Sequence, residues 1–343
     1  MKNLLLPLPL ATPIKVDWVN IVNWMHLKTK WLKNDFSMIF FVLAGLIILN
    51  VIMQDRFFEY SVIKSNLMTM APLILLAVAQ GIVIMSGGID LSIGGIVTLV
   101  NVIMASLMDD SMGSVVIAVL TAFLVGIGAS ALNGLLVGIL RLPSMVATFG
   151  TSAVWFGLSL FIMPQPGGYV PAMFYRMYKD SLGGFVPVAL IFIVLAYLVF
   201  YFFKKRRLYT HLLAAGGNED SASASGINVS KVRLQAFMFS GAFISLAGVV
   251  LTASTASGDS GLGSSIPLNS IAAAVVGGIA MQGGKGSFAG ALAGACILAL
   301  ITNIIFFANV PSIYQDFIKG LVIVGALILA TIPRIRAMRK YAG

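Results

Sequence analysis

A single carboxylate, Asp90, stands in a long uncharged part of the chain, within the stretch "MSGGIDLSIG" at residues 85–94. Between Lys64 and Asp109, Asp90 is the only residue with a charged side chain. Because burying a charge is costly, an acid kept in apolar surroundings marks a gate, an ion site or a solute contact. The glycines beside it suggest a second role, in which Asp90 caps the next helix and accepts its free backbone N–H groups. The sequence leaves both roles open, and they are compatible.

Neutral polar and aromatic side chains occur in the apolar stretches on both sides of Asp90. The candidates that we single out are Gln80, Ser92, Asn133, Phe149 and Trp155. Amide and hydroxyl groups can bind the hydroxyls of an uncharged polar solute such as a sugar, and aromatic rings can cover its C–H faces. Amides and hydroxyls in membrane helices also join helices to one another. We predict that these residues and Asp90 line a solute pathway, with helix-to-helix hydrogen bonds as the alternative.

The sequence carries no set of groups for enzyme catalysis or for binding a metal ion. The stretch "GGKGS" at 283–287 resembles a phosphate-binding loop, but Ile279 and Gly286 stand where that motif requires a glycine and a hydroxyl residue. The two histidines lie far apart in the chain, and Cys296 is the only cysteine. We therefore predict no catalytic residue, no metal ion and no cofactor bound by this chain.

The composition is that of an integral membrane protein. Hydrophobic residues make up 59% of the chain and charged residues 10%, whereas about 25% of a soluble domain is charged. A helix that crosses a bilayer needs about 20 apolar residues, and the chain has about ten such runs. They lie near residues 36–53, 66–86, 89–107, 114–140, 144–163, 185–203, 234–255, 266–282, 287–304 and 314–332. Because the runs lack the alternation of barrel strands, we predict an all-α, polytopic transmembrane helical bundle.

Basic residues indicate how the chain is oriented in the membrane. The net charge is +10, and Lys and Arg gather before the first run, at 204–207, and after the last run. With ten crossings these groups lie on one side, and the acidic pair Asp109–Asp110 lies on the other. Basic loops stay in the cytoplasm, so both termini are predicted to be cytoplasmic, and no nucleic acid is needed to explain the charge. The predicted organisation is an uncleaved N-terminal segment at 1–35, a transmembrane domain at 36–332 and a basic tail at 333–343.

A pattern of glycines recurs in the two halves of the chain. "MSGGIDLSIG" at 85–94 and "MQGGKGSFAG" at 281–290 share the pattern M-x-G-G-x5-G, and each follows an apolar run that contains Pro72 or Pro267. Many transport folds consist of two related halves whose helices are interrupted by glycine near the pathway. The pattern therefore predicts a weak internal repeat, with a broken helix in each half.

The longest polar connection between apolar runs covers residues 204–233. Asn218 is predicted to cap a helix of about two turns that carries Glu219 and Asp220 at its start, and Gly226 is predicted to end it. Connections longer than about a dozen residues usually have a functional reason. We predict that this helix docks a cytosolic partner, the alternative being a plain connecting helix.

Three stretches of the sequence resemble one family. "MSGGIDLSIG", "AAGGNEDSASASGINVSKVR" in the long polar loop and "AAAVVGGIAMQGGKGSFAGALAGA" at 272–295 together resemble the ribose-type permease subunits of bacterial ABC importers, over residues 66–330. The resemblance implies a multi-pass protein of the bacterial inner membrane, surrounded by lipid, that pairs with a second permease copy or a paralogue. It also implies a periplasmic sugar-binding protein and cytosolic ATPase subunits that hold ATP and Mg. The ATPase-coupling residues that it implies are Gly216, Gly217, Asn218, Glu219, Asp220 and Gly226.

The expected function is therefore the membrane channel of an ATP-driven importer for a pentose, a hexose or a related polyol. Two alternatives remain open. The same fold could import a nucleoside, a signalling sugar or a branched-chain amino acid, although an amino acid would favour fixed charges inside the membrane, which this chain nearly lacks. An ion-coupled secondary carrier would need buried ionisable groups, and the sequence offers one, Asp90.

Overall fold

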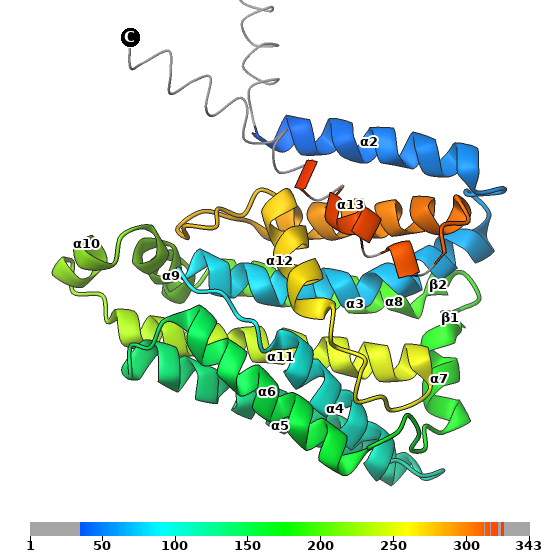
Figure 1. Cartoon of the computed structure of the whole chain (residues 1–343), viewed down its shortest axis with the longest axis horizontal. Helices are drawn as coiled ribbons and strands as arrows, with labels where there is room; N and C mark the ends of the chain where they lie inside the picture. The colour runs from blue at the N-terminus through cyan, green and yellow to red at the C-terminus, as the bar shows by residue number, and fades with distance from the viewer. Residues whose placement is uncertain (1–34, 312, 316, 322–323, 326–343) are drawn as a thin grey trace, which may run out of the picture. The chain divides into compact units, whose positions relative to one another are not determined.

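The computed structural model describes residues 35–311, 313–315, 317–321 and 324–325 (Figure 1). The basic tail at 333–343 and all of the N-terminal segment except Asp35 lie outside the described residues, as does much of the last predicted run. From Ile39 onward, the described residues belong to one compact unit. The predicted helical fold is confirmed, with one short hairpin of two-residue strands added.

The elements follow one another along the chain as nearly continuous helix. In order they are α2 (Asp35–Met53), α3 (Tyr60–Met85), α4 (Ile93–Leu107), α5 (Met112–Gly134), the π-helix η1 (Leu135–Ile139), α6 (Ser144–Ile162), α7 (Ala172–Lys179), β1 (Ser181–Leu182), β2 (Val186–Pro187), α8 (Val188–Lys204), α9 (Arg207–Gly217), α10 (Glu219–Ala224), α11 (Val229–Thr255), α12 (Ile266–Val276) and α13 (Phe288–Phe307). The two strands pair antiparallel.

Five of these helices are long and apolar enough to cross a membrane. They are α3, α5 together with η1, α6, α11 and α13, and α8 with α9 forms a sixth candidate that is bent by 80°. Helices α4 and α12 are apolar but have 15 and 11 residues, fewer than the about 20 that a full crossing needs. Helices occupy the predicted runs between residues 36 and 304, but the described residues contain five or six candidate spans. The count of ten crossings stays a prediction.

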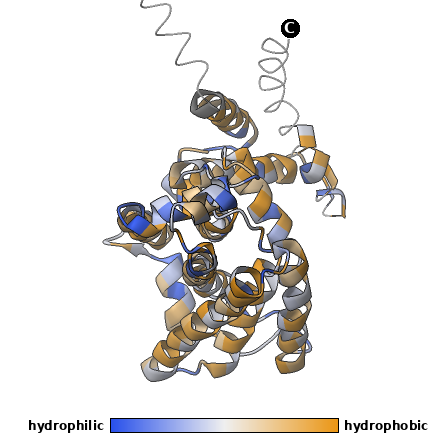
Figure 2. Ribbon diagram, turned by 90° about the vertical axis from the view of Figure 1, so that its left-hand side faces the viewer, coloured by the Kyte–Doolittle hydropathy of each residue, from blue (hydrophilic) through white to orange (hydrophobic). Residues whose placement is uncertain are grey.

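Helices α3 and α11 form the core of the compact unit, and they pack against each other (Figure 1). Within their most apolar windows, 78% of α3 and 72% of α11 is buried, against 33% for the α5–η1 helix and 28% for α6. The outer helices therefore keep large apolar side chains exposed, such as Leu124 (75%) and Phe161 (85%). Figure 2 shows the same hydrophobic character along most of the helical ribbons. Such a surface suits lipid or another membrane helix rather than water.

Small residues bring α5 and α11 into close contact. Gly126 and Ser130 of α5 face Gly241 and Ser245 of α11, and a Cβ atom added to Gly241 would lie 2.9 Å from the carbonyl oxygen of Gly126. Membrane helices that lack bulky side chains at their contact can approach closely and gain van der Waals contacts along their backbones. This contact holds α5, and the polar residue Asn133 near its end, against the central helix.

Both predicted glycine breaks are present. Residues 86–92 separate α3 from α4, and residues 277–287 separate α12 from α13. The first glycine after each methionine has a left-handed backbone, with φ of +86° at Gly87 and +87° at Gly283, a conformation that side chains with a Cβ disfavour. The repeated sequence pattern therefore coincides with a left-handed glycine in both breaks, although the second glycine is left-handed only in the later one, at Gly284.

The long polar connection contains two helices, α9 and α10. Helix α10 is the predicted short helix: the Asn218 side chain accepts a hydrogen bond from the backbone N–H of Ser221 (2.8 Å), and Gly226 follows with φ of +80°. Helix α9 was not predicted, because its basic start resembles a loop that follows a membrane span. Its apolar face includes Leu212, which is fully buried.

Candidate functional site

Asp90 is fully buried in the turn between α3 and α4. One carboxylate oxygen, Oδ1, accepts hydrogen bonds from the backbone N–H of Ser92 (2.8 Å) and from the Ser92 hydroxyl (2.6 Å). The other oxygen, Oδ2, is buried and has no hydrogen-bond partner among the described residues. Asp90 therefore forms a local side-chain turn that directs the chain into α4.

This arrangement corrects the predicted cap in one respect. Ser92, rather than Asp90, occupies the N-cap position of α4, and its side chain makes no bond to the free N–H groups of that helix. Asp90 accepts a backbone N–H from the residue before the helix instead. The physical reason is that Asp90 lies three residues before the first helical residue, Ile93, so its short side chain reaches the turn and not the first helical turn.

Ser92 joins Asp90 to two of the outer helices. The Ser92 hydroxyl accepts a hydrogen bond from the side-chain amide nitrogen of Asn133 on α5 (2.6 Å). The amide oxygen of Asn133 in turn accepts from the hydroxyl of Thr151 on α6 (2.6 Å). All four side chains are at most 8% exposed. A series of hydrogen bonds thus connects Asp90 through Ser92 to α5 and α6. In a buried site such bonds are strong, because water does not compete for the donors and acceptors.

Gln80 on α3 is hydrogen-bonded to the backbone of Asp90. In the amide orientation that matches donors with acceptors, the Gln80 nitrogen donates to the carbonyl oxygen of Asp90 (3.0 Å) and the Gln80 oxygen accepts from its N–H (3.3 Å). Gln80 is fully buried. The sequence candidates Gln80, Asp90, Ser92 and Asn133 therefore come together in one network.

Two further residues of α6 hold the same turn and were missed by sequence analysis. The Ser144 hydroxyl accepts from the N–H of Ile89 (3.1 Å), and the Thr148 hydroxyl accepts from the N–H of Leu91 (2.9 Å). Together with Thr151 they are spaced i, i+4 and i+7 along α6, which places them on one face of the helix. That spacing of hydroxyl residues is the signal that would have found them.

The two aromatic candidates do not join this network. Phe149 is 69% exposed and lies on another face of α6 from Thr148 and Thr151. Trp155, one turn beyond Thr151, packs against Gly95 of α4, where an added Cβ would lie 3.0 Å from the Trp155 Cβ. The indole N–H of Trp155 is buried and has no hydrogen-bond partner among the described residues.

The coupling candidates lie at the ends of α9 and α10. Gly216 is buried, whereas Gly217 and Asp220 are exposed. Glu219 is tied to α11, because the guanidinium group of Arg233 donates to both of its carboxylate oxygens (3.2 and 2.6 Å). This pair was also missed by sequence analysis. The pair leaves Asp220 and the neighbouring serines as the exposed polar groups of α10 that are not tied to α11.

The far end of α4 carries the acidic pair. The Tyr169 hydroxyl donates a hydrogen bond to a carboxylate oxygen of Asp110 (2.6 Å), and this bond raises the pKa of Tyr169. Hydrogen bonds from Ser111 hold the pKa of the exposed Asp109 below its usual value. The two ends of α4 are thus chemically distinct, with a buried network at one end and exposed acids at the other.

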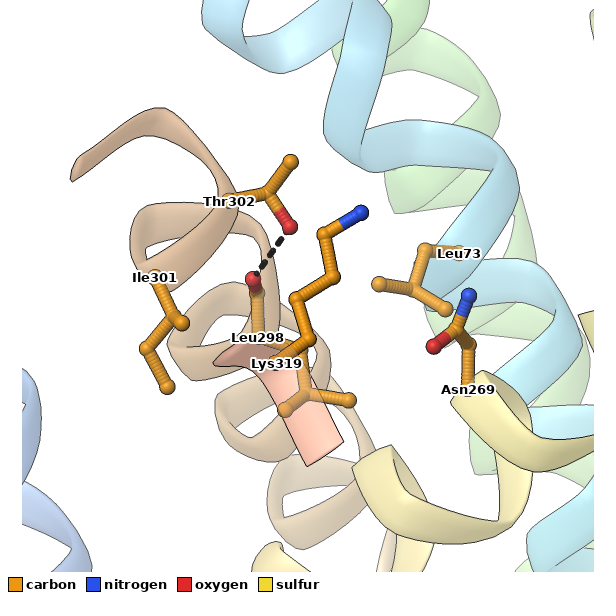
Figure 3. A pocket seen from close by; sticks show the side chains of 6 residues that line it. All are labelled: Leu73, Asn269, Leu298, Ile301, Thr302 and Lys319. Carbon is orange, nitrogen blue, oxygen red and sulfur yellow. Dashed lines mark hydrogen bonds between the residues drawn. The ribbon is translucent and has the colours of Figure 1, made fainter. Parts of the chain in front are cut away.

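A small cleft with polar and apolar lining lies apart from the Asp90 network, between α3, α12, α13 and the segment around residue 319 (Figure 3). It is lined by Leu73, Asn269, Leu298, Ile301, Thr302 and Lys319. Figure 3 shows the Lys319 side chain extending between Thr302 and Leu73, and Thr302 donates its hydroxyl proton to the carbonyl oxygen of Leu298 (3.0 Å). Sequence analysis singled out none of these residues. Among the described residues, no three His, Cys, Asp or Glu side chains are placed to hold a metal ion.

Comparisons with known proteins find similar sequences over most of the chain. Residues 62–327 match the family described as "Branched-chain amino acid transport system / permease component". The autoinducer 2 import system permease protein LsrC of Yersinia enterocolitica is 32% identical over 279 residues, which cover 79% of this chain and 76% of that protein. The proteins of the same name from Salmonella choleraesuis (31% over 260 residues, 75% and 74%) and Yersinia pseudotuberculosis (31% over 279 residues, 79% and 78%) are similar to it as well. No solved structure matches the chain.

Proposed function

The chain belongs to this family of transport-system permeases, and from that membership we propose that it is the membrane channel subunit of an ATP-driven importer for a sugar or a sugar-like solute. A permease moves its solute and performs no chemical reaction on it. ATP hydrolysis is proposed to take place in separate cytosolic subunits, because the chain has no phosphate-binding motif of its own.

The observation that carries this proposal is the position of α10. Helix α10 exposes small side chains and Asp220 to solvent, while Arg233 ties its first residue, Glu219, to the central helix α11. A short exposed helix anchored in this way can transmit a force applied by a docked partner to the core. The buried Asp90 network belongs to the turn at residues 86–92, which α9 contacts at Gly87. A displacement of α10 and α9 would therefore be transmitted over a short distance to the polar residues of the proposed pathway.

For the solute we propose a sugar or a signalling molecule related to one. The named relatives are import permeases for autoinducer 2. The buried polar side chains around Asp90 are amides and hydroxyls, which bind uncharged hydroxyl groups well. The family description names branched-chain amino acids, but an ammonium group and a carboxylate would favour opposite fixed charges near the pathway, and the buried network of this chain has a single acid.

We further propose ten crossings with both termini in the cytoplasm of a bacterium, in its inner membrane. Lys285 and Arg233 lie in or beside the segments that meet α9 and α10, whereas Asp109 and Asp110 lie at the opposite end of α4. This distribution of charge supports a cytoplasmic α10, since basic residues favour the cytoplasmic side. The short helices α4 and α12 would then cross the bilayer together with the extended segments next to them.

The proposed partners are two cytosolic ATPase subunits, a second permease copy or a paralogue, and a periplasmic binding protein that delivers the solute. The exposed apolar side chains of the outer helices α5 and α6, such as Leu124 and Phe161, support a surface that faces lipid or a second permease.

The proposal is tested by purifying the tagged chain from native membranes in a mild detergent and identifying the proteins that accompany it. We expect an ATPase subunit to copurify with the native chain and to be lost or reduced with Asp220→Lys, which reverses an exposed charge on α10. Glu219 is left unchanged, because its replacement would also break the Arg233 pair. Asp180→Lys is the matched control, since it makes the same change of charge at the end of α7, forty residues before Asp220 in the chain. Absence of an ATPase under conditions that preserve other transporter complexes would contradict the proposal.

A further inference from the structure

Gly216, near the end of α9, lies where the two glycine turns, at Gly87 and at Gly283–Gly284, meet. It is buried, and a Cβ atom added to it would overlap the carbonyl oxygen of Met85. The same atom would lie 2.9 Å from the backbone nitrogens of both Gly87 and Gly284. Real Cβ atoms do not approach other atoms so closely, so only glycine fits at this position. One residue of α9 therefore touches the backbone of both broken helices.

The two turns are also bonded to each other at this point. The backbone N–H of Gly284 donates a hydrogen bond to the carbonyl oxygen of Met85 (3.0 Å). From the second turn, a Cβ on Gly283 would lie 2.5 Å from the carbonyl oxygen of Gly216. We call this set, Met85, Gly87, Gly216, Gly283 and Gly284, the glycine junction.

A second contact ties α9 to the same turn. The hydroxyl of Tyr209, on α9, donates to the carbonyl oxygen of Gly286 (3.2 Å). Gly286 in turn lies against the Met85 side chain, since an added Cβ there would be 2.7 Å from the Met85 sulfur. Helix α9 thus contacts the second turn at two places along its length, and a movement of α9 must displace this turn or break both contacts.

The first turn leads directly into the polar network. Gly88 donates its N–H to the carbonyl oxygen of Val83 (3.1 Å), and the next residues, Ile89 and Asp90, are the ones that α6 and Gln80 hold. Only Gly88 and Ile89 lie between Gly87 and Asp90, and both are held by hydrogen bonds, Gly88 to Val83 and Ile89 to Ser144. These bonds restrict the segment, so a shift at Gly87 must break them or be passed on toward Asp90.

We propose that Gly216 is the positioning residue through which movement of α9 and α10 displaces both broken helices together. This inference rests on the proposed function, in which an ATPase supplies that movement. Backbone contact without intervening side chains makes the connection stiff, because closely packed backbones cannot adjust by changing rotamers. Both broken helices then change position in the same step of the transport cycle.

A glycine outside the coupling residues provides a matched control. Gly128 of α5 is exposed, and a Cβ atom on it would meet nothing within 4 Å. Gly216→Ala and Gly128→Ala therefore add the same methyl group to two helical glycines. One methyl is forced into the glycine junction and the other enters open space.

The experiment compares both variants with the native chain in the complete importer, reconstituted with its ATPase and its binding protein. Copurified ATPase, ATP hydrolysis and solute uptake are measured for each. We expect Gly216→Ala to keep its ATPase and to lose uptake by about tenfold or more, since overpacking a rigid contact shifts equilibria by such factors. Gly128→Ala should stay within about twofold of the native rate.

Several results would overturn the inference. Native uptake by Gly216→Ala would do so, as would an equal loss of uptake in both variants, because the effect would then be independent of the junction. If no ATPase accompanies the native chain, the proposed function fails and the inference fails with it. If an ATPase does accompany the native chain and Gly216→Ala transports normally, the inference fails alone.

A second measurement on the native complex decides the case in which Gly216→Ala does not reach the membrane. Hydrogen exchange is compared between the nucleotide-free complex and the complex trapped with a non-hydrolysable ATP analogue. Peptides that contain residues 84–88, 212–218 and 282–286 should change their protection together, because the Gly284 N–H bond to Met85 lies within the junction. A change in the α9 peptide with no change in either glycine turn would overturn the inference.

Discussion

Replacing Asp90 separates the two roles of its carboxyl group, the local turn and the acid. Asp90→Ala removes the acceptor of two hydrogen bonds from Ser92, at 2.8 and 2.6 Å. Hydrogen bonds to a carboxylate contribute about 1.5–3 kcal/mol each and are not additive when they share an acceptor, so we expect a loss of about 2–4 kcal/mol. Asp90→Asn keeps an accepting oxygen at the same place, so its stability should stay within about 1 kcal/mol of the native protein.

The assay measures thermal unfolding of the detergent-solubilised complex together with solute uptake. If the acid takes part in gating or in contact with the solute, Asp90→Asn assembles normally and loses most of its uptake. Equal destabilisation by Asn and Ala would refute the hydrogen-bond explanation of the turn. Native uptake by Asp90→Asn at native expression would refute the role in gating and leave Asp90 as a residue that shapes the turn alone.

Three further predictions test the packing around this site. Thr148→Val leaves the part-buried N–H of Leu91 without its acceptor and should lower the free energy of unfolding by about 1–2 kcal/mol, which a thermal-shift measurement would detect. An unchanged midpoint would contradict the assignment. Glu219→Gln should cost less than about 1 kcal/mol, because its side chain is 46% exposed and exposed ion pairs contribute little; a large loss of folded protein would contradict this. Gly126→Ala should lower the free energy of unfolding by about 1–3 kcal/mol, because the added methyl group overpacks the α5–α11 contact. Gly128→Ala, which adds a methyl group in open space, should be neutral or slightly stabilising. Equal changes in the thermal midpoint of the two variants would disprove close packing at Gly126.

The helices and the breaks between them could be predicted from sequence because both depend on local properties. Apolar runs of sufficient length form helices in a membrane wherever they occur. The turns at Gly87 and Gly283 were predictable because paired glycines interrupt a helix by their own conformational freedom. The short helix after Asn218 was predictable because its cap, its acidic first turn and its terminal glycine lie within a few residues of one another.

The parts that sequence analysis missed depend on contacts between distant segments. Ser144 and Thr148 hold a turn that lies more than fifty residues earlier in the chain, and nothing local marks them except their helical spacing. The pairing of Glu219 with Arg233 was missed because both residues stand in a charged stretch, where many pairings are equally compatible with the sequence. Lys319 lies in a run that was assigned as an ordinary apolar span, so its position in the cleft beside Asn269 and Thr302 could be found only from the fold.

Energy coupling is the property that tests the central claim most directly. Right-side-out membrane vesicles that contain the native chain, its ATPase and its binding protein are loaded with ATP or with a non-hydrolysable analogue, and solute uptake is measured with and without an ionophore. The account predicts uptake that requires hydrolysable ATP and persists after the ion gradients are collapsed. Uptake that continues without ATP and stops when the ionophore is added would contradict it and would identify an ion-coupled carrier, with Asp90 as the candidate for its coupling site.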